Sequence, residues 1–236
     1  MDTSVAVIAG TAALIALTHT VIGVDHYLPF VALGRARNWS YRRLAAVVVV
    51  CGVGHVASSV ALGFLGIALG IAVGKLEGVE STRGEVASYL LIAFGLIYML
   101  WGLRAAFRNQ AHAHEHTHAD GSVHQHHHDH HGSHLHAHER SGRSPLVWVL
   151  FLLFVFGPCE PLIPLIMYPA AKSSIAGVVL VAGVFAVVTI AVMLAMTMAL
   201  YAGALRLRWQ RFERYTHAAA GFAILAAGLL VAFGGI

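Results

Sequence analysis

Charge is scarce in this chain, and so are interruptions of its apolar sequence. Charged residues make up 11% of the 236 positions and hydrophobic residues 58%, whereas soluble domains carry roughly 25% charged residues. The mean hydropathy is +0.73. This balance excludes an ordinary soluble domain and is typical of a protein that spans a lipid bilayer.

Positive charge is missing from the N-terminal end, and cysteine is rare throughout. No Lys or Arg precedes Arg35, so the basic region of a secretory signal is lacking and we expect the first apolar run to be a permanent helix. The two cysteines are Cys51 and Cys159. Each lies within a predicted span rather than in an exposed loop, which argues against a structural disulfide.

The apolar sequence falls into blocks that are long enough to cross about 30 Å of hydrocarbon as helices. A bilayer admits only helices or closed barrels, and none of the blocks shows the alternation of barrel strands. We therefore predict an all-α, polytopic membrane protein with six transmembrane helices. The predicted spans are 4–33, 44–74, 87–106, 146–170, 174–203 and 215–235.

The basic residues predict how these spans are oriented. Twelve of the 15 Lys and Arg residues lie in or beside the loops that follow the first, third and fifth spans; the others are Lys75, Arg83 and Lys172. This asymmetry places the third loop in the cytoplasm and both termini outside, in a bacterial-type cytoplasmic membrane. Because the orientation of the spans accounts for the arginines, we expect no nucleic acid as a partner.

The six spans divide three and three around residues 107–144, giving a first repeat over 1–106 and a second over 145–236. The first helix of each half is interrupted by glycine and proline, at Gly23–Pro29 and at Gly157–Pro164. Both helices should break there, because proline removes a backbone donor and disfavours helix at the preceding residue. Three spans per half predict an inverted repeat, and matching broken helices indicate a substrate site near the midplane.

His19, Asp25 and His26 are the only His, Asp, Glu, Lys or Arg residues in the first predicted span. A charged group at bilayer depth costs about 2.5–3.5 kcal/mol or more and usually marks the path of an ion or proton. The two histidines would be ~10 Å apart along an intact helix, so they can share a metal only if the helix unwinds near Gly23. The alternative is a pair of packing histidines with Asp25 as their hydrogen-bond partner.

Other membrane-embedded side chains could complete a metal site. His55 lies four residues after Cys51, so the two share a helix face; the alternative for His55 is a packing role with a hydrogen bond to serine. Cys159 offers a thiolate if a metal deprotonates it. Glu160, the one acidic residue of its span, could be a ligand, a proton carrier or the partner of a histidine.

Histidine dominates the long polar loop. Thirteen of the 17 histidines lie between His112 and His138, and the segment has too little apolar content to form a core, so we expect disorder without a ligand. Neutral imidazole is the commonest metal ligand, although such tracts accept zinc, nickel, cobalt and copper alike; a plain flexible linker is the alternative. The loop residues expected to bind metal are His112, His114, His116, His118, His126, His127, His128, His130, His131, His134, His136 and His138.

Together these residues resemble those of the nickel/cobalt transporter families, which belong to a superfamily of six-span inverted-repeat carriers. In nickel permeases a histidine, four intervening residues and Asp-His form the first motif; here five residues separate His19 from Asp25 and His26. The resemblance implies that Asp25 and His26 bind metal. The segment Phe156–Pro161 is also similar to the proline-flanked cysteine of thiol carriers used in cytochrome c maturation, but the first half lacks the matching cysteine.

We therefore expect a transporter, not an enzyme, for a divalent transition-metal ion: nickel or cobalt, with zinc as a further option. The expected partners are the ion, the bilayer and, optionally, a cytoplasmic metallochaperone. The alternatives are a membrane thiol–disulfide electron carrier that uses Cys51 and Cys159, an anion exporter, and a metal sensor without transport. The residues expected to handle the ion within the membrane are His19, Asp25, His26, His55, Cys159 and Glu160.

Overall fold

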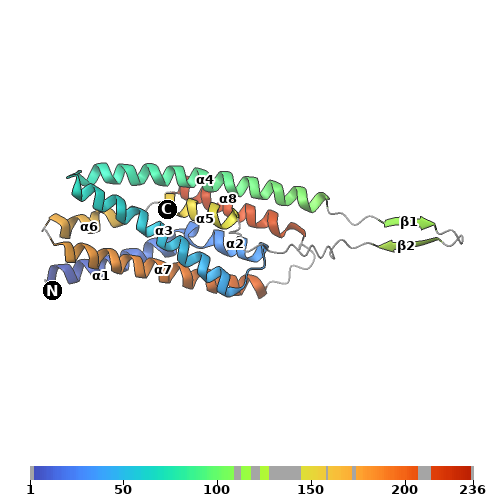
Figure 1. The fold of residues 1–236 in the computed structure, drawn as a ribbon, viewed down its shortest axis with the longest axis horizontal. Coiled ribbons are helices and arrows are strands. Elements are labelled where there is room, and N and C mark those ends of the chain that lie inside the picture. Colours follow the sequence, from blue (N-terminus) through green and yellow to red (C-terminus); the bar gives the residue numbers. More distant parts are fainter. Residues whose placement is uncertain are drawn as a thin grey trace.

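Apolar helices lie side by side along one axis, and a short pair of strands projects from one end of the bundle (Figure 1). The computed structural model describes residues 3–108, 113–117, 123–127, 145–157, 159–171, 174–206 and 214–234. Its elements are α1 (Thr3–Ile22), the 3-10 helix η1 (Val24–His26), α2 (Leu28–Ala36), α3 (Tyr41–Ala68), α4 (Val73–Arg108), β1 (Ala113–Thr117), β2 (Val123–His127), α5 (Pro145–Phe156), α6 (Leu162–Ala171), α7 (Ile175–Arg206) and α8 (Thr216–Gly234).

Four of these helices, α3, α4, α7 and α8, are long and apolar enough to cross a membrane. The pair α1 and α2 is bent by 83° at a short break and makes a fifth span if it is counted as one. Residues 146–170, predicted as one further span, are divided between α5 and α6. A helical membrane protein is thus confirmed, with four to five candidate spans in the part of the chain that the structure describes.

The third predicted span begins earlier than its apolar run indicated. Helix α4 starts at Val73 and not at residue 87, so Lys75 and Arg83 lie within a helix rather than in the predicted loop. The connection from α3 is a tight turn, in which Gly70 takes the left-handed φ of 63° that favours glycine. The polar residues that suggested a loop are therefore the first turns of a long helix.

Helices from the two halves pack against each other in pairs. α1 lies along α7, α3 contacts both α5 and α6, and α4 lies along α8. α4 and α8 approach each other closely because small residues lie at their interface, as is common between membrane helices. A Cβ at Gly95, Gly102 or Gly221 would meet backbone atoms of the other helix. Two apolar clusters fill the bundle, and Cys51 belongs to one while Cys159 belongs to the other.

Two five-residue strands stand where the composition predicted disorder. β1 and β2 pair antiparallel, with His114 opposite His126 and His116 opposite His124. Asp120-Gly121 between the two runs is typical of hairpin turns, so a local signal favours this pairing. The predicted loop ligands that lie outside the described residues are His112, His118, His128, His130, His131, His134, His136 and His138.

Candidate functional site

The first broken helix turns sharply around Gly23. Helix α1 ends at Ile22, the single turn η1 follows, and α2 begins at Leu28. The chain supplies its own hydrogen bonds through the break: the Gly23 amide donates to the His19 carbonyl at 2.9 Å, and the His26 amide donates to the Gly23 carbonyl at 3.1 Å. The predicted unwinding near Gly23 is confirmed.

Glycine is needed at position 23 because two polar side chains fold back over it. A Cβ there would collide with His26 Nδ1 and lie 3.1 Å from Asp25 Oδ1. The backbone φ of −70° is accessible to any residue, so space, not backbone strain, demands glycine. The absence of a side chain lets an imidazole and a carboxylate occupy the inner side of the bend.

Three imidazoles meet at this bend. The ring centroids of His19 and His26 are 4.8 Å apart, and those of His26 and His55 are 5.1 Å apart. One nitrogen from each ring lies within 4.8 Å of the other two, and both His26 and His55 are buried. The structure therefore brings together the three membrane-embedded histidines that the sequence placed on two separate spans.

The hydrogen bonds of His26 leave one ring nitrogen free for a ligand. Its Nδ1 is 3.1 Å from the Gly23 carbonyl and 3.2 Å from Asp25 Oδ1. Both partners can only accept a hydrogen bond, so the ring proton is assigned to Nδ1. Nε2 of His26 and Nε2 of His19 are buried without a hydrogen-bond partner in the described part of the chain. Metal-binding histidines usually donate their other ring N–H to a carboxylate in this way, which fixes the orientation of the ring.

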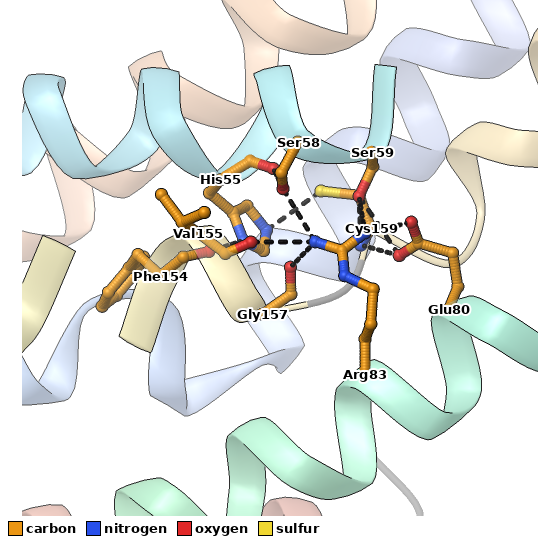
Figure 2. Close-up of polar contacts among 9 residues, drawn as sticks. All are labelled: His55, Ser58, Ser59, Glu80, Arg83, Phe154, Val155, Gly157 and Cys159. Carbon is orange, nitrogen blue, oxygen red and sulfur yellow. Dashed lines mark hydrogen bonds and ion pairs between the residues drawn. The ribbon is translucent and has the colours of Figure 1, made fainter. Parts of the chain in front are cut away.

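His55 connects this cluster to Cys159 (Figure 2). Its Nδ1 lies 3.1 Å from the Phe154 carbonyl, and its Nε2 lies 2.9 Å from Cys159 Sγ. Because the carbonyl can only accept, Nδ1 donates and Nε2 accepts from the thiol in the neutral pair. Cys159 is fully buried. A metal could use this nitrogen only after the thiol has moved or has lost its proton.

The second broken helix is held by an arginine from α4. The guanidinium of Arg83 donates to the Val155 carbonyl at 2.8 Å, to the Gly157 carbonyl at 3.4 Å and to Ser58 Oγ at 2.8 Å (Figure 2). These carbonyls lie at the C-terminal end of α5, where a helix leaves acceptors without partners and favours a positive charge.

Glu80 holds the other side of the same break. This residue is fully buried and forms an ion pair with Arg83. Its Oε2 accepts from Ser59 Oγ at 3.1 Å and from the Cys159 amide at 3.2 Å. The Cys159 segment is therefore fixed by side chains from α3 and α4, as a break at membrane depth requires, because backbone groups there must be satisfied by protein.

Glu80 and Arg83 are site residues that the sequence argument missed. The low hydropathy of the stretch before residue 87 predicts a loop, so its basic residues enter the sequence argument only through topology. The available signal was the spacing: opposite charges three residues apart on a helix are neighbours on one face. Recognising residues 73–86 as helix would have placed this pair on the third predicted span, where ionisable groups are candidates for function.

The remaining predicted residues lie in different surroundings. Asp25 and Glu160 line a cavity of about 730 Å³ together with His19 and His26. Glu160 is exposed, whereas Asp25 is partly buried. Cys51 is fully buried in the other apolar cluster. Both cysteines are free thiols, so the two do not form a disulfide here.

Comparison with known proteins identifies the family. The model described as cytochrome C biogenesis protein transmembrane region matches residues 27–233. The chain belongs to this family. No curated protein and no solved structure matches the chain. Membership fits the broad superfamily inferred from the sequence, favours the thiol–disulfide alternative over metal transport, and lends no support to the nickel/cobalt transporter families specifically.

The family match covers only part of the candidate site. The match begins at Tyr27, directly after the turn that carries Asp25 and His26. It includes His55 and Cys159 but not His19, Asp25 or His26. Two of the three clustered histidines, His19 and His26, thus lie outside the matched residues, and His55 lies within them.

Proposed function

We propose that the protein carries a divalent transition-metal ion across the membrane, with nickel or cobalt as the first candidates and zinc as a further one. The observation that carries this proposal is the cluster of His19, His26 and His55, whose nitrogens lie within 4.8 Å of one another. Two of these rings have a buried Nε2 without a hydrogen-bond partner among the described residues. Imidazole suits borderline metals of this kind.

Each nearby residue has a role in this proposal. Asp25 keeps the proton of His26 on Nδ1 and makes Nε2 a better ligand. His55 enters the ligand set when Cys159 turns away or binds as a thiolate, which divalent transition metals favour by displacing the thiol proton. Glu160 lies on the cavity wall at the approach to the cluster.

The proposed transport path lies between two inverted three-helix halves. The packing supports this arrangement, because exchanging the halves relates contacts that are both present: α1 with α7 corresponds to α5 with α3, α2 with α7 corresponds to α6 with α3, and α4 pairs with α8. Alternating access would rock the halves around the cluster. The distribution of basic residues supports a cytoplasmic histidine-rich loop, which would gather metal and exchange it with a metallochaperone.

A membrane thiol–disulfide carrier is the second candidate, and the family match favours it. In that reaction the thiols of Cys51 and Cys159 would form a disulfide and pass two electrons and two protons to a disulfide of a partner protein. The contact of Cys159 Sγ with His55 Nε2 at 2.9 Å supplies a base for the thiol. However, disulfide formation requires Cα atoms within about 7 Å, and the two cysteines belong to different apolar clusters.

Metal flux into reconstituted vesicles tests both candidates. Nickel, cobalt, zinc and copper are compared for the wild type, the double variant Asp25→Ala/His26→Ala, a deletion of residues 112–138, and Cys51→Ser. Saturable flux that is lost in the double variant but kept in the other two supports the metal carrier. Absence of flux for every metal, with Cys51 and Cys159 cycling between thiol and disulfide, overturns it in favour of the thiol carrier.

A further inference from the structure

The 730 Å³ cavity is partly open and reaches the histidine cluster from one side of the bundle. Its wall is built by residues of α1, by the stretch of α4 from Ser81 to Tyr89, and by the end of α8. The first break and Glu160 of the second break complete it. The cavity therefore touches both broken helices.

The charge on this wall has one sign. Asp25, Glu85 and Glu160 line the cavity, and no Lys or Arg does so among the described residues. Arg83 lies in the same stretch of α4 but is not a lining residue of the cavity. Its guanidinium is paired with Glu80 and donates to carbonyls of the second break. Walls of one charge focus the field within a cleft and raise the local concentration of oppositely charged ions.

The lining of the cavity also includes a residue with an unpartnered nitrogen. His26 lines it, is only 3% exposed, and has a buried Nε2 without a hydrogen-bond partner in the described residues. A buried nitrogen of this kind costs free energy unless a ligand reaches it. The carboxylate residues and His26, whose Nε2 lacks a partner, thus line one open space.

We propose that this cavity is a cation entrance, in which Glu85 and Glu160 attract divalent cations and deliver them to the histidine cluster. The inference deepens the proposed metal transport and rests on it. The carboxylates would act on encounter rather than as final ligands. Neutralising them should therefore weaken the apparent affinity for the ion without changing the maximum rate.

Labelling with charged thiol reagents tests the electrostatics without any transport. Ser81→Cys places a thiol on the cavity wall, and Thr82→Cys places one at the next, exposed position of α4 outside it. The native thiols are fully buried, so the unmodified chain gives the background rate. At low salt the rate ratio of a cationic to an anionic methanethiosulfonate should be about tenfold higher at position 81 than at 82. It should approach the ratio at 82 in high salt.

The double change Glu85→Gln/Glu160→Gln should also bring the two labelling ratios together. In vesicles it should raise the KM for Co²⁺ about tenfold, while Glu77→Gln, an exposed residue of α4 that is not on the wall, should leave KM unchanged. The proposal of a cation entrance is overturned by equal labelling ratios at positions 81 and 82. It is also overturned if the protein transports Co²⁺ and the double variant has an unchanged KM. If the wild type moves no metal, the proposed function fails, and the labelling ratio alone decides whether the cavity attracts cations.

Discussion

The two helix breaks both contain local backbone hydrogen bonds, but they differ in the support that they receive from other helices. At the first break the chain bonds its own backbone, with amides of Gly23 and His26 reaching carbonyls a few residues away. At the second break the Gly157 amide also bonds local carbonyls. The Cys159 amide and the Val155 carbonyl there bond Glu80 and Arg83 of another helix, α4. The first break therefore leaves its own ionisable side chains available to a ligand. The second break engages two ionisable side chains of another helix to complete its backbone hydrogen bonds.

Removing the arginine from the second break should have the largest effect. Arg83→Met leaves the buried Glu80 carboxylate without its partner, and breaking a buried ion pair costs about 3–5 kcal/mol. We expect the free energy of unfolding in detergent to fall by roughly this amount. Lys75→Met, at an exposed position of the same helix, should change it by less than about 0.5 kcal/mol. Equal stabilities of the two variants would show that the second break does not depend on α4.

Removing an imidazole from the first break should abolish function with less loss of stability. His26→Ala deletes a proposed direct ligand, and even loss of an outer-shell partner costs 10–100-fold in metal affinity. We expect the initial rate of nickel or cobalt flux to fall by at least about 100-fold. His217→Ala removes a histidine that instead contacts Tyr98 Oη at 2.9 Å, and it should retain flux. Flux that survives in the His26 variant would remove the cluster from the transport path.

A methyl group at the inner side of the first bend should have an intermediate effect. In Gly23→Ala the new Cβ displaces the His26 ring and crowds the Asp25 carboxylate. Because this disturbs a proposed ligand without deleting it, we expect about a tenfold loss of metal affinity. This is the lower end of the loss caused by removing a residue that orients a metal ligand. Gly10→Ala is the matched control, since nothing lies within 4 Å of its Cβ. Titration with Co²⁺, followed by its absorption bands, measures both, and equal affinities would contradict the space requirement.

The smallest effect is expected at Cys51. If the protein carries metal, Cys51→Ala should leave flux nearly unchanged, because this thiol lies in an apolar cluster separate from that of Cys159. Cys159→Ala should alter the metal dependence, since its Sγ contacts His55. A thiol carrier requires the opposite pattern, in which both changes abolish activity equally. Assaying flux and thiol redox state on the same preparations therefore distinguishes the two functions.

Local features of the sequence predicted much of the fold and part of the site. Long apolar runs predicted membrane helices, and glycine with proline predicted both breaks, because these signals act through the nearest backbone. The first-break residues were found because ionisable groups are rare in a span. The start of α4 was missed, because charged residues such as Glu80 and Arg83 form helix readily but resemble a solvated loop when only hydropathy is considered.

The order of residue types alone predicts that the chain is helical, that it spans a membrane, and that two helices break at Gly23 and near Cys159. Which residues meet at these breaks depends on how the helices pack. His55 and Cys159 are 104 positions apart in the chain, yet His55 Nε2 and Cys159 Sγ are 2.9 Å apart. Glu80 likewise contacts the second break from another helix. Hydrophobic pattern and backbone propensity act over one or two turns. Contacts between helices depend instead on side-chain packing, so sequence spacing cannot specify them.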